Sequence, residues 1–304
     1  MSAPVVQSLA PSTGEAMRLA ARLRARVHEI EVHRFPDDEL RVTVGPAAAT
    51  TVVYASLDRP NEKLLAVLFA ADALRRGGAR RIVLVAPYLC YMRQDAAFRP
   101  GEAVSQKVVG RLLAGAVDRI VTVDAHLHRA RALPEVFPGI EADNLSAMPA
   151  IADALRQDGF DPRTVVVGPD AESRAWVGDL ARRLGLPHAI AEKTRHGDRS
   201  VDLGFADAAA LCGRPALLVD DIVSSGGTLI ACAKSLAAAG AGPVDAVVTH
   251  ALFPPELTDA FLRAGIRSLR STCSVPHPTN AIHLDGLLAE ALRSETGGEP
   301  QGTP

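Results

Sequence analysis

The sequence predicts an α/β fold made of two similar domains, each a mainly parallel sheet flanked by helices. Short apolar runs rich in Val, Ile and Leu alternate with helical segments through most of the chain. The runs are apolar throughout, as expected of parallel strands that are covered on both faces. The length of 304 residues suggests two domains at ~100–200 residues per domain.

Each predicted strand is a short apolar run, typical of a buried strand. The runs are Thr51–Ser56, Arg81–Ala86, Arg119–Val123, Thr164–Gly168, Pro187–Ala191, Pro215–Asp221 and Ala246–His250. After the turn-like Phe35-Pro36-Asp37-Asp38, we expect Arg41–Val44 to add an antiparallel strand.

The segments between these strands have helical period. One face collects Leu64, Val67, Leu68, Ala71 and Leu74, and a second collects Val104, Val108, Leu112 and Gly115. Thr228–Ala239 is rich in Ala, and Gly240 follows it at a C-cap position.

A weak similarity between two segments of the chain suggests two similar domains. Ile82–Ala86 is followed by Pro-Tyr, and Val165–Gly168 is followed by Pro-Asp. The Pro- and Gly-containing segment Leu133–Asn144 is the expected crossing point. The expected divisions are residues 1–145, residues 146–293 and a disordered tail at 294–304.

Composition excludes several classes of protein. Lys plus Arg number 33 and Asp plus Glu 35, a net charge of −2, which argues against a nucleic-acid partner. The longest apolar stretches, such as Leu64–Ala71, are far shorter than the ~20 residues of a membrane span. No signal peptide is evident at the N-terminus, and the four scattered cysteines suit reduced thiols, so we expect a cytoplasmic protein.

One motif carries the most chemistry. The strand-like run from Ala216 ends in Asp220 and Asp221, and a loop of Ser224, Ser225, Gly226, Gly227 and Thr228 opens a helix. Small residues, hydroxyls and a helix N-terminus suit a phosphate, and carboxylates at a strand end suit sugar hydroxyls or hydrated Mg²⁺. The alternative is an ordinary strand–turn–helix with a Ser N-cap. The motif is neither a Walker A loop nor a G-x-G-x-x-G fingerprint.

This motif resembles the phosphoribosyl pyrophosphate (PRPP) loop of the type I phosphoribosyltransferase fold. Other segments narrow the resemblance to the ribose-phosphate diphosphokinase (PRPP synthetase) family, in order over roughly residues 5–290. The five segments are Arg34–Leu40, Ser56–Glu62, Pro87–Asp95, Val123–His126 and Val219–Thr228. Plain phosphoribosyltransferases share only the last.

The resemblance implies a reaction and an assembly. In that family ATP donates its β,γ-diphosphate to the anomeric hydroxyl of ribose 5-phosphate, Mg²⁺ is required, and the products are PRPP and AMP. It also implies two phosphoribosyltransferase-like domains with the active site between them, and a homo-oligomer in which a neighbouring subunit completes the adenine site.

The resemblance also assigns roles to residues of this chain. ATP would be contacted by Arg93, Gln94, Asp95 and His126, and by Phe35, Asp37 and Glu39 of the adjacent protomer. Metal would be held at His126 and Asp170. Ribose 5-phosphate would be held by Asp170, Asp220, Asp221, Ser224, Ser225, Gly226, Gly227 and Thr228. Lys193 and Arg195 would lie on a flap that closes over the reacting phosphate.

Physical chemistry supports these roles but allows plainer ones. A guanidinium suits a polyphosphate, an aromatic ring can stack on adenine, and cations can stabilise the charge of phosphoryl transfer. Alternatively, Arg93–Asp95 is a surface loop, Phe35 a hydrophobic staple, Asp170 a turn residue, His126 a surface or core residue, and Lys193–Arg199 a solvated charged loop.

Several departures from the family pattern mark a divergent branch. Ala96 and Ala97 replace the usual Arg-Lys, Ala171-Glu172-Ser173 replaces Gly-Gly, and Ser224-Ser225 replaces Asp-Thr. These departures leave open whether phosphate activates the protein, which nucleotide is the donor and which sugar phosphate is the acceptor. Two rival functions also stay open: a non-catalytic regulatory homologue, and a phosphoribosyltransferase that consumes PRPP.

Overall fold

The computed structural model describes residues 4–127, 132–196 and 200–296. The chain forms two compact units, one of residues 1–145 and 284–304 and one of residues 146–283. Each unit holds a seven-stranded sheet within the described residues.

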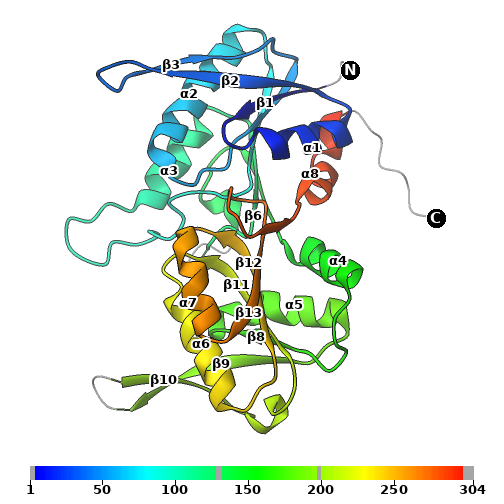
Figure 1. Cartoon of the computed structure of the whole chain (residues 1–304). Helices are drawn as coiled ribbons and strands as arrows, with labels where there is room; N and C mark the ends of the chain where they lie inside the picture. Colours follow the sequence, from blue (N-terminus) through cyan, green and yellow to red (C-terminus); the bar gives the residue numbers. More distant parts are fainter. Residues whose placement is uncertain (1–3, 128–131, 197–199, 297–304) are drawn as a thin grey trace. The chain divides into compact units, whose positions relative to one another are not determined.

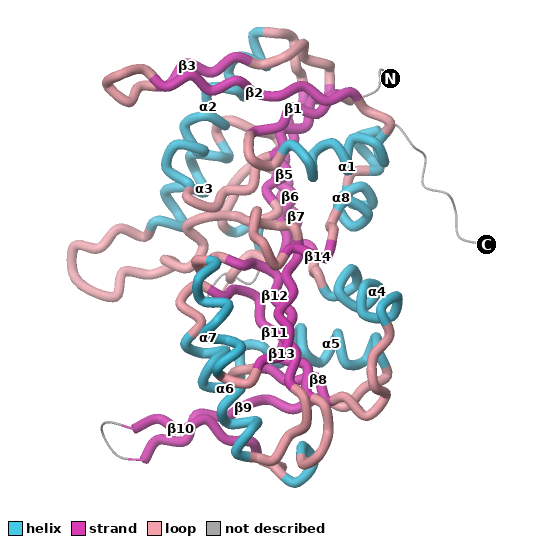
Figure 2. The backbone as a smooth tube through the Cα atoms, in the orientation of Figure 1, coloured by secondary structure: helices cyan, strands magenta, loops and turns pink. Residues whose placement is uncertain are grey.

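The first unit has the strand order β3-β2-β1-β4-β5-β6-β7 (Figures 1 and 2). All neighbours are parallel except β2 and β3, which pair antiparallel from Arg34↔Leu40 to Glu31↔Thr43. The antiparallel piece expected near Arg41–Val44 is therefore confirmed as β3. The strands are β1 (Val5–Leu9), β2 (Arg26–Arg34), β3 (Leu40–Thr43), β4 (Thr50–Tyr54), β5 (Arg81–Ala86), β6 (Arg119–Val123) and β7 (Glu141–Leu145).

Helices cover both faces of this sheet, α2 and α3 on one side and α1 and α8 on the other (Figure 1). The core forms because β4, β5 and β6 are buried almost throughout, as both-face burial of parallel strands requires. The helices are α1 (Thr13–Leu23), α2 (Pro60–Arg76), α3 (Ser105–Ala114) and α8 (Asp285–Ala291), with short 3₁₀ turns η1 (Leu133–Glu135) and η5 (Arg293–Thr296).

The second unit has the strand order β10-β9-β8-β11-β12-β13-β14, again parallel except for its outermost pair, β9 and β10. Its strands are β8 (Val165–Gly168), β9 (His188–His196), β10 (Ser200–Phe205), β11 (Ala216–Val223), β12 (Val244–Ala251), β13 (Ile266–Thr272) and β14 (Asn280–Ile282).

Helices again lie on both faces, α6 and α7 on one side and α4 and α5 on the other (Figure 1). They are α4 (Met148–Asp158), α5 (Arg174–Leu184), α6 (Gly227–Ala238) and α7 (Thr258–Arg263), with 3₁₀ turns η2 (Ala171–Ser173), η3 (Ala209–Leu211) and η4 (Pro255–Leu257).

The two sheets repeat one topology, which confirms two similar domains. In strand order, β8 corresponds to β1, β11 to β4, and β9–β10 to β2–β3. The two segments whose similarity suggested this repeat, Ile82–Ala86 and Val165–Gly168, are not equivalent strands. They are β5 and β8, which hold different places in their sheets.

The C-terminal segment differs from the expected division of the chain. The sequence predicts residues 284–293 in the second domain, but they pack in the first unit. There α8 lies against α1, and Arg22 pairs with Asp285. The segment Leu133–Asn144 also belongs to the first unit, and the units divide after Leu145. The turn η5 (Arg293–Thr296) includes the first three residues of the tail expected at 294–304. Residues 297–304 lie outside the described residues.

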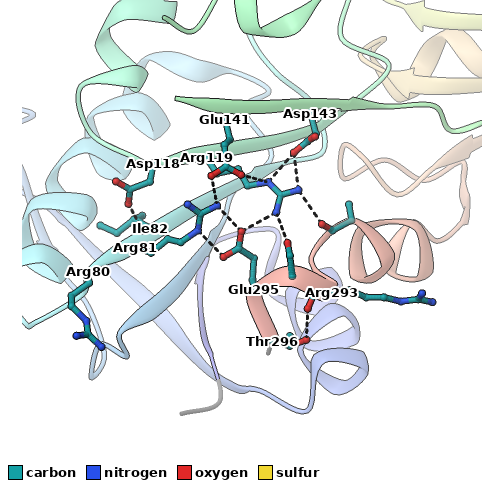
Figure 3. Close-up of polar contacts among 12 residues, drawn as sticks. Arg80, Arg81, Ile82, Asp118, Arg119, Glu141, Asp143, Arg293, Glu295 and Thr296 are labelled. Carbon is teal, nitrogen blue, oxygen red and sulfur yellow. Dashed lines mark hydrogen bonds and ion pairs between the residues drawn. The ribbon is translucent and has the colours of Figure 1, made fainter. Parts of the chain in front are cut away.

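A buried ion network ties this segment to the amino edge of the first sheet (Figure 3). The Glu295 carboxylate accepts from Arg81 Nε at 2.7 Å and Nη2 at 2.8 Å, and from Arg119 Nη1 at 2.8 Å. Arg119 also donates to Asp143 Oδ2 at 2.8 Å and to the Ala291 carbonyl at 3.0 Å. The Glu295 side chain is only 5% exposed, so its ion pairs contribute more than a surface ion pair does.

Helix α3 buries a different face from the one expected. Val108 and Leu112 are 50% and 45% exposed, while Val109, Gly110 and Leu113 are buried. Gly110 sets this orientation, because a Cβ on it would lie 2.1 Å from the Val136 carbonyl oxygen.

None of the helices that the structure describes combines the length and the apolar character of a membrane span.

We predict that Glu295→Gln destabilises the chain by about 1.5–3 kcal/mol near neutral pH, the size of hydrogen bonds to a charged group. Burial acts to raise the pKa of Glu295, but the hydrogen bonds from Arg81 and Arg119 outweigh it and hold that pKa below its usual value. A depressed carboxylate pKa adds stability above the ordinary pKa and loses it as pH falls through the folded value. The loss in free energy of unfolding caused by Glu295→Gln should therefore be smaller at acid pH.

Unfolding by denaturant at pH 7 and at pH 4 measures this difference. Glu290→Gln is the matched control, because Glu290 pairs with Arg293 on an exposed helix end and should change stability little. Equal losses for the two variants at pH 7 would contradict the prediction.

Candidate active site

In the second unit, the loop between β11 and α6 leaves the carboxyl edge of the sheet. Strand β11 is buried from Ala216 to Val219 and then half-buried at Asp220 and Asp221. Ser225 and Thr228 of the following loop are exposed, and Ser224 is half-buried. The sequence-predicted acids and hydroxyls therefore lie together at one edge of this sheet.

Gly226 gives this loop its shape. It is the N-cap of α6 in the left-handed conformation, with φ 75°, which favours glycine. A Cβ at this position would lie 2.7 Å from the Phe261 ring. No side chain caps α6, so its first N–H groups and the positive end of the helix dipole face outward, as an oxyanion site requires.

Negative charge is concentrated beside this loop. Burial, and then the carboxylates of Asp221 and Asp170, raise the pKa of Asp220 well above its usual value. The same effect reaches Cys232 in α6: burial, with the charges of Asp220 and Asp170, raises the pKa of its thiol to about 12. Two strand ends, those of β8 and β11, thus direct carboxylates to one place.

Asp170 is oriented by the residues that follow it in η2. Its Oδ1 accepts from the main-chain N–H groups of Glu172 at 3.1 Å and Ser173 at 3.3 Å, and so caps η2. The Ser173 hydroxyl donates to the Asp170 carbonyl at 2.5 Å. Ser173 packs so closely that a Cβ on Gly168 would lie 2.0 Å from its Oγ. Residues 171–173 therefore cap Asp170 with two main-chain N–H groups and with the Ser173 hydroxyl.

Carboxylates of the kind that binds magnesium lie at this edge, although the oxygens of Asp170, Asp220 and Asp221 do not all lie within 4.8 Å of one another. Asp170, Asp220 and Asp221 offer the hard oxygen ligands that Mg²⁺ prefers. Burial first, and then the charges of Asp221 and Asp170, raise the pKa of Asp220 and so favour its neutral form, and a bound cation would oppose this shift. His126 offers nitrogen, which suits Mg²⁺ less well.

In the first unit, the loop after β5 carries the residues predicted to bind ATP. The Arg93 side chain is exposed, and it makes no hydrogen bond or ion pair within the described part of the chain. Gln94 Nε2 donates to the Ala96 carbonyl at 3.1 Å, and Asp95 is buried at 7% exposure. Arg93 is thus available to an anion, whereas Asp95 lies in the interior.

Three backbone outliers mark this edge of the sheet. Arg59, Tyr91 and Asp124 have φ values of 47°, 60° and 39°, and they follow the carboxyl ends of β4, β5 and β6. Strained non-glycine residues gather at functional sites. His126 follows on the last of these loops, half-buried, where Ala125 N donates to Asn144 Oδ1 at 2.8 Å.

Phe35, Asp37 and Glu39 lie in the turn of the β2–β3 hairpin, which projects from the edge of the first sheet (Figure 1). Phe35 N donates to the Glu39 carbonyl at 2.8 Å, His33 meets the Phe35 ring edge-on at 4.9 Å, and Arg41 lies 6.0 Å from it. Strands β1 and β4 separate this hairpin from the Arg93 strand, β5.

Lys193 and Arg195 lie on β9, opposite Leu203 and Val201 of β10. The strand expected at Pro187–Ala191 therefore continues to His196. The rest of the expected basic segment, residues 197–199, lies outside the described residues.

Sequence reasoning missed residues that hold these loops. Gln106 Nε2 donates to the Met92 carbonyl at 3.1 Å, Tyr91 donates to Asn61 Oδ1, and Phe261 packs under Gly226. An isolated glutamine or phenylalanine carries no local signal of such a role. The paired aromatics of Pro87-Tyr-Leu-Cys-Tyr91 were the nearest hint.

Comparison with known proteins agrees with the geometry. Residues 6–116 match the N-terminal domain of ribose phosphate pyrophosphokinase, and residues 143–257 match the phosphoribosyl transferase domain. The ribose-phosphate pyrophosphokinase of Methanopyrus kandleri is 33% identical over 95% of this chain and 99% of its own length. That of Bradyrhizobium diazoefficiens is 35% identical over 88% of this chain and 84% of its own.

A solved structure extends the match. The crystal structure of phosphoribosylpyrophosphate synthetase from Mycobacterium smegmatis aligns with a TM-score of 0.82 and 25% identity, covering 97% of this chain and 99% of that one. The paired sheets, the loop after β11 and these relatives lead to one conclusion: the chain belongs to the ribose-phosphate pyrophosphokinase family.

Proposed function

We propose that this protein transfers the β,γ-diphosphate of ATP to the 1-hydroxyl of ribose 5-phosphate, giving PRPP and AMP, in nucleotide biosynthesis in the cytoplasm. The observation that carries the proposal is the loop at Ser224–Thr228, in which an uncapped helix N-terminus follows two carboxylates. It is supported by family membership over nearly the whole chain.

Ribose 5-phosphate binds at this loop. Its 5-phosphate accepts hydrogen bonds from the first N–H groups of α6 and from the hydroxyls of Ser224, Ser225 and Thr228. Asp220 and Asp221 accept from the ribose hydroxyls, and Asp170, fixed by its cap on η2, holds the reacting side of the sugar or its metal.

ATP binds to the first unit. Arg93 presents to the phosphates a guanidinium that makes no hydrogen bond or ion pair within the described residues. Gln94 and His126 are further donors. Phe35 stacks on adenine while Asp37 and Glu39 accept from its amino group. Because the Phe35 hairpin and the Arg93 loop belong to separated strands of one sheet, we propose that a neighbouring subunit supplies the hairpin.

A homo-oligomer is also supported by an exposed apolar face. Leu65 and Phe69 of α2 are 48% and 45% exposed, and Val108 and Leu112 of α3 are exposed to a similar degree. Both helices cover the same face of the first sheet (Figure 2). Neighbouring exposed apolar residues are typical of a protein–protein interface.

The chemistry rests on positioning and charge. The anomeric oxygen attacks the β-phosphorus in line, the bond from that phosphorus to the oxygen bridging it to the α-phosphate breaks, and AMP leaves with that oxygen and the electron pair. The hydroxyl proton passes to solvent or to a phosphate oxygen. Lys193 and Arg195, two positions apart on β9, stabilise the charge that spreads over the transferred group. When bound at Asp170, Asp220 and Asp221, or beside His126, Mg²⁺ would neutralise phosphate charge. No residue needs to act as a strong base, because orientation alone supplies a large acceleration.

The first test is turnover. We expect the purified chain to form AMP from ATP only when ribose 5-phosphate and Mg²⁺ are both present, and to lose activity on chelation and regain it when Mg²⁺ is restored. Chromatographic separation of AMP and PRPP measures this. Binding of both compounds without turnover would favour a regulatory homologue, and consumption of PRPP with a base would favour a phosphoribosyltransferase.

Gly226→Ala tests the phosphate loop. The left-handed φ and the Phe261 ring both oppose a Cβ, so the loop must shift. We expect KM for ribose 5-phosphate to rise about ten- to a hundredfold, the loss of about one charge-assisted hydrogen bond, with KM for ATP little changed.

Gly240→Ala is the matched control for this substitution. Gly240, just beyond the other end of α6, has φ 73°, so the same backbone strain arises away from the loop. A rise in KM of similar size in both variants would refute the role of the loop.

The shared adenine site predicts complementation between two defective variants. Phe35→Ala and Arg93→Ala should each be nearly inactive alone. Mixed oligomers should regain about a quarter of wild-type sites, because a hairpin and a loop from different protomers form intact sites at random. Coexpression followed by an activity assay measures this, and no recovery in verified mixed oligomers would place the adenine site within one protomer.

A further inference from the structure

We infer that Gln106, together with the Tyr91–Asn61 pair, is the positioning device that aims the Arg93–Gln94 loop at the phosphates of the nucleotide. The inference rests on the proposed function, because it concerns the loop that would bind ATP. It assigns a role to three residues that touch neither substrate in the proposed mechanism.

Gln106 grips the loop on both sides of Arg93. Its side chain, in the first turn of α3, is 4% exposed and donates through Nε2 to the Met92 carbonyl at 3.1 Å. Its main-chain N–H donates to the Gln94 carbonyl at 3.2 Å. One residue thus holds the Met92–Arg93 peptide and the Gln94–Asp95 peptide, which flank Arg93 and Gln94.

A second contact, between Tyr91 and Asn61, joins the same loop to helix α2. Tyr91 stands in the left-handed conformation at φ 60°, and its hydroxyl donates to Asn61 Oδ1 in the first turn of α2. The Leu57 N–H donates to the Tyr88 carbonyl at 2.9 Å, which joins the loops after β4 and β5. A strained tyrosine persists only where its surroundings determine it, and here a hydrogen bond to α2 does so.

This arrangement matters because Arg93 has no tether of its own. The guanidinium is exposed, so its direction depends on the backbone that carries it. A misplacement of about 1 Å at a positioning residue can cost about a hundredfold in rate. A rigid loop also lowers the ordering cost of binding.

The test is Gln106→Met, which keeps the length of the side chain and removes its donor. We expect KM and Kd for ATP to rise about tenfold, the size of one buried hydrogen bond, with KM for ribose 5-phosphate unchanged. Gln7→Met is the matched control. Gln7 is also fully buried, donating to the Pro46 carbonyl at 3.2 Å and accepting from Gly45 N at 3.0 Å, so it should lose stability and keep its KM for ATP.

Two further variants separate positioning from folding. Gln106→Glu can donate to the Met92 carbonyl only when protonated, so its KM for ATP relative to wild type should fall as the pH is lowered. Tyr91→Phe should raise KM for ATP by itself. Combined with Gln106→Met, it should be non-additive, because both contacts hold one loop.

The outcomes are distinguishable. An equal effect of Gln106→Met and Gln7→Met on KM for ATP, equal effects on both substrates, or no effect on ATP binding would overturn the inference. A wild-type protein that binds ATP but forms no AMP would refute the proposed function instead, and the Kd for ATP of the Gln106 variants would still decide the role of Gln106.

Discussion

Parallel pairing is the constraint on which both halves of the site depend. When neighbouring strands run the same way, their carboxyl ends share one edge of the sheet, and the loops that follow them are gathered there. Asp170 and Asp220 lie in this way at the ends of β8 and β11, and the charge of Asp170 adds to the effects of burial and Asp221 that raise the pKa of Asp220. In the first unit the loops after β5 and β6 are brought together by the same pairing.

The two units use one topology for different chemistry. The loop after β4 corresponds to the loop after β11, and a left-handed residue precedes the helix in both. In the second unit that residue is Gly226, and the helix N–H groups stay open. In the first it is Arg59, followed by Pro60, which has no N–H to offer an anion. Lys63 closes the loop further by donating to Asp58 and to the Ser56 carbonyl.

Much of the fold could be predicted from the sequence, because parallel strands buried on both faces leave a strong apolar signal. Runs such as Arg81–Ala86 and Arg119–Val123 are strands with the expected bounds. Outer strands such as β2, the second strand from one edge, and β7, at the other edge, were not recognised, because their exposed faces carry polar residues. The buried face of α3 depended on the close approach of Gly110 to Val136, a tertiary fact. The phosphate loop could be recognised because its functional residues are adjacent in the sequence. Gln106 could not, because it acts through a contact with Met92, fourteen positions away.

The corresponding hairpins at the outer edges of the two sheets have a consequence for how such an enzyme diverges. β2–β3 and β9–β10 occupy the same place in their sheets and are the antiparallel pairs there. Each is joined to the rest of its sheet along one side only, so its tip can lengthen, shorten or change composition without disturbing a buried strand. The two tips can therefore change in length and composition independently of each other and of the buried central strands.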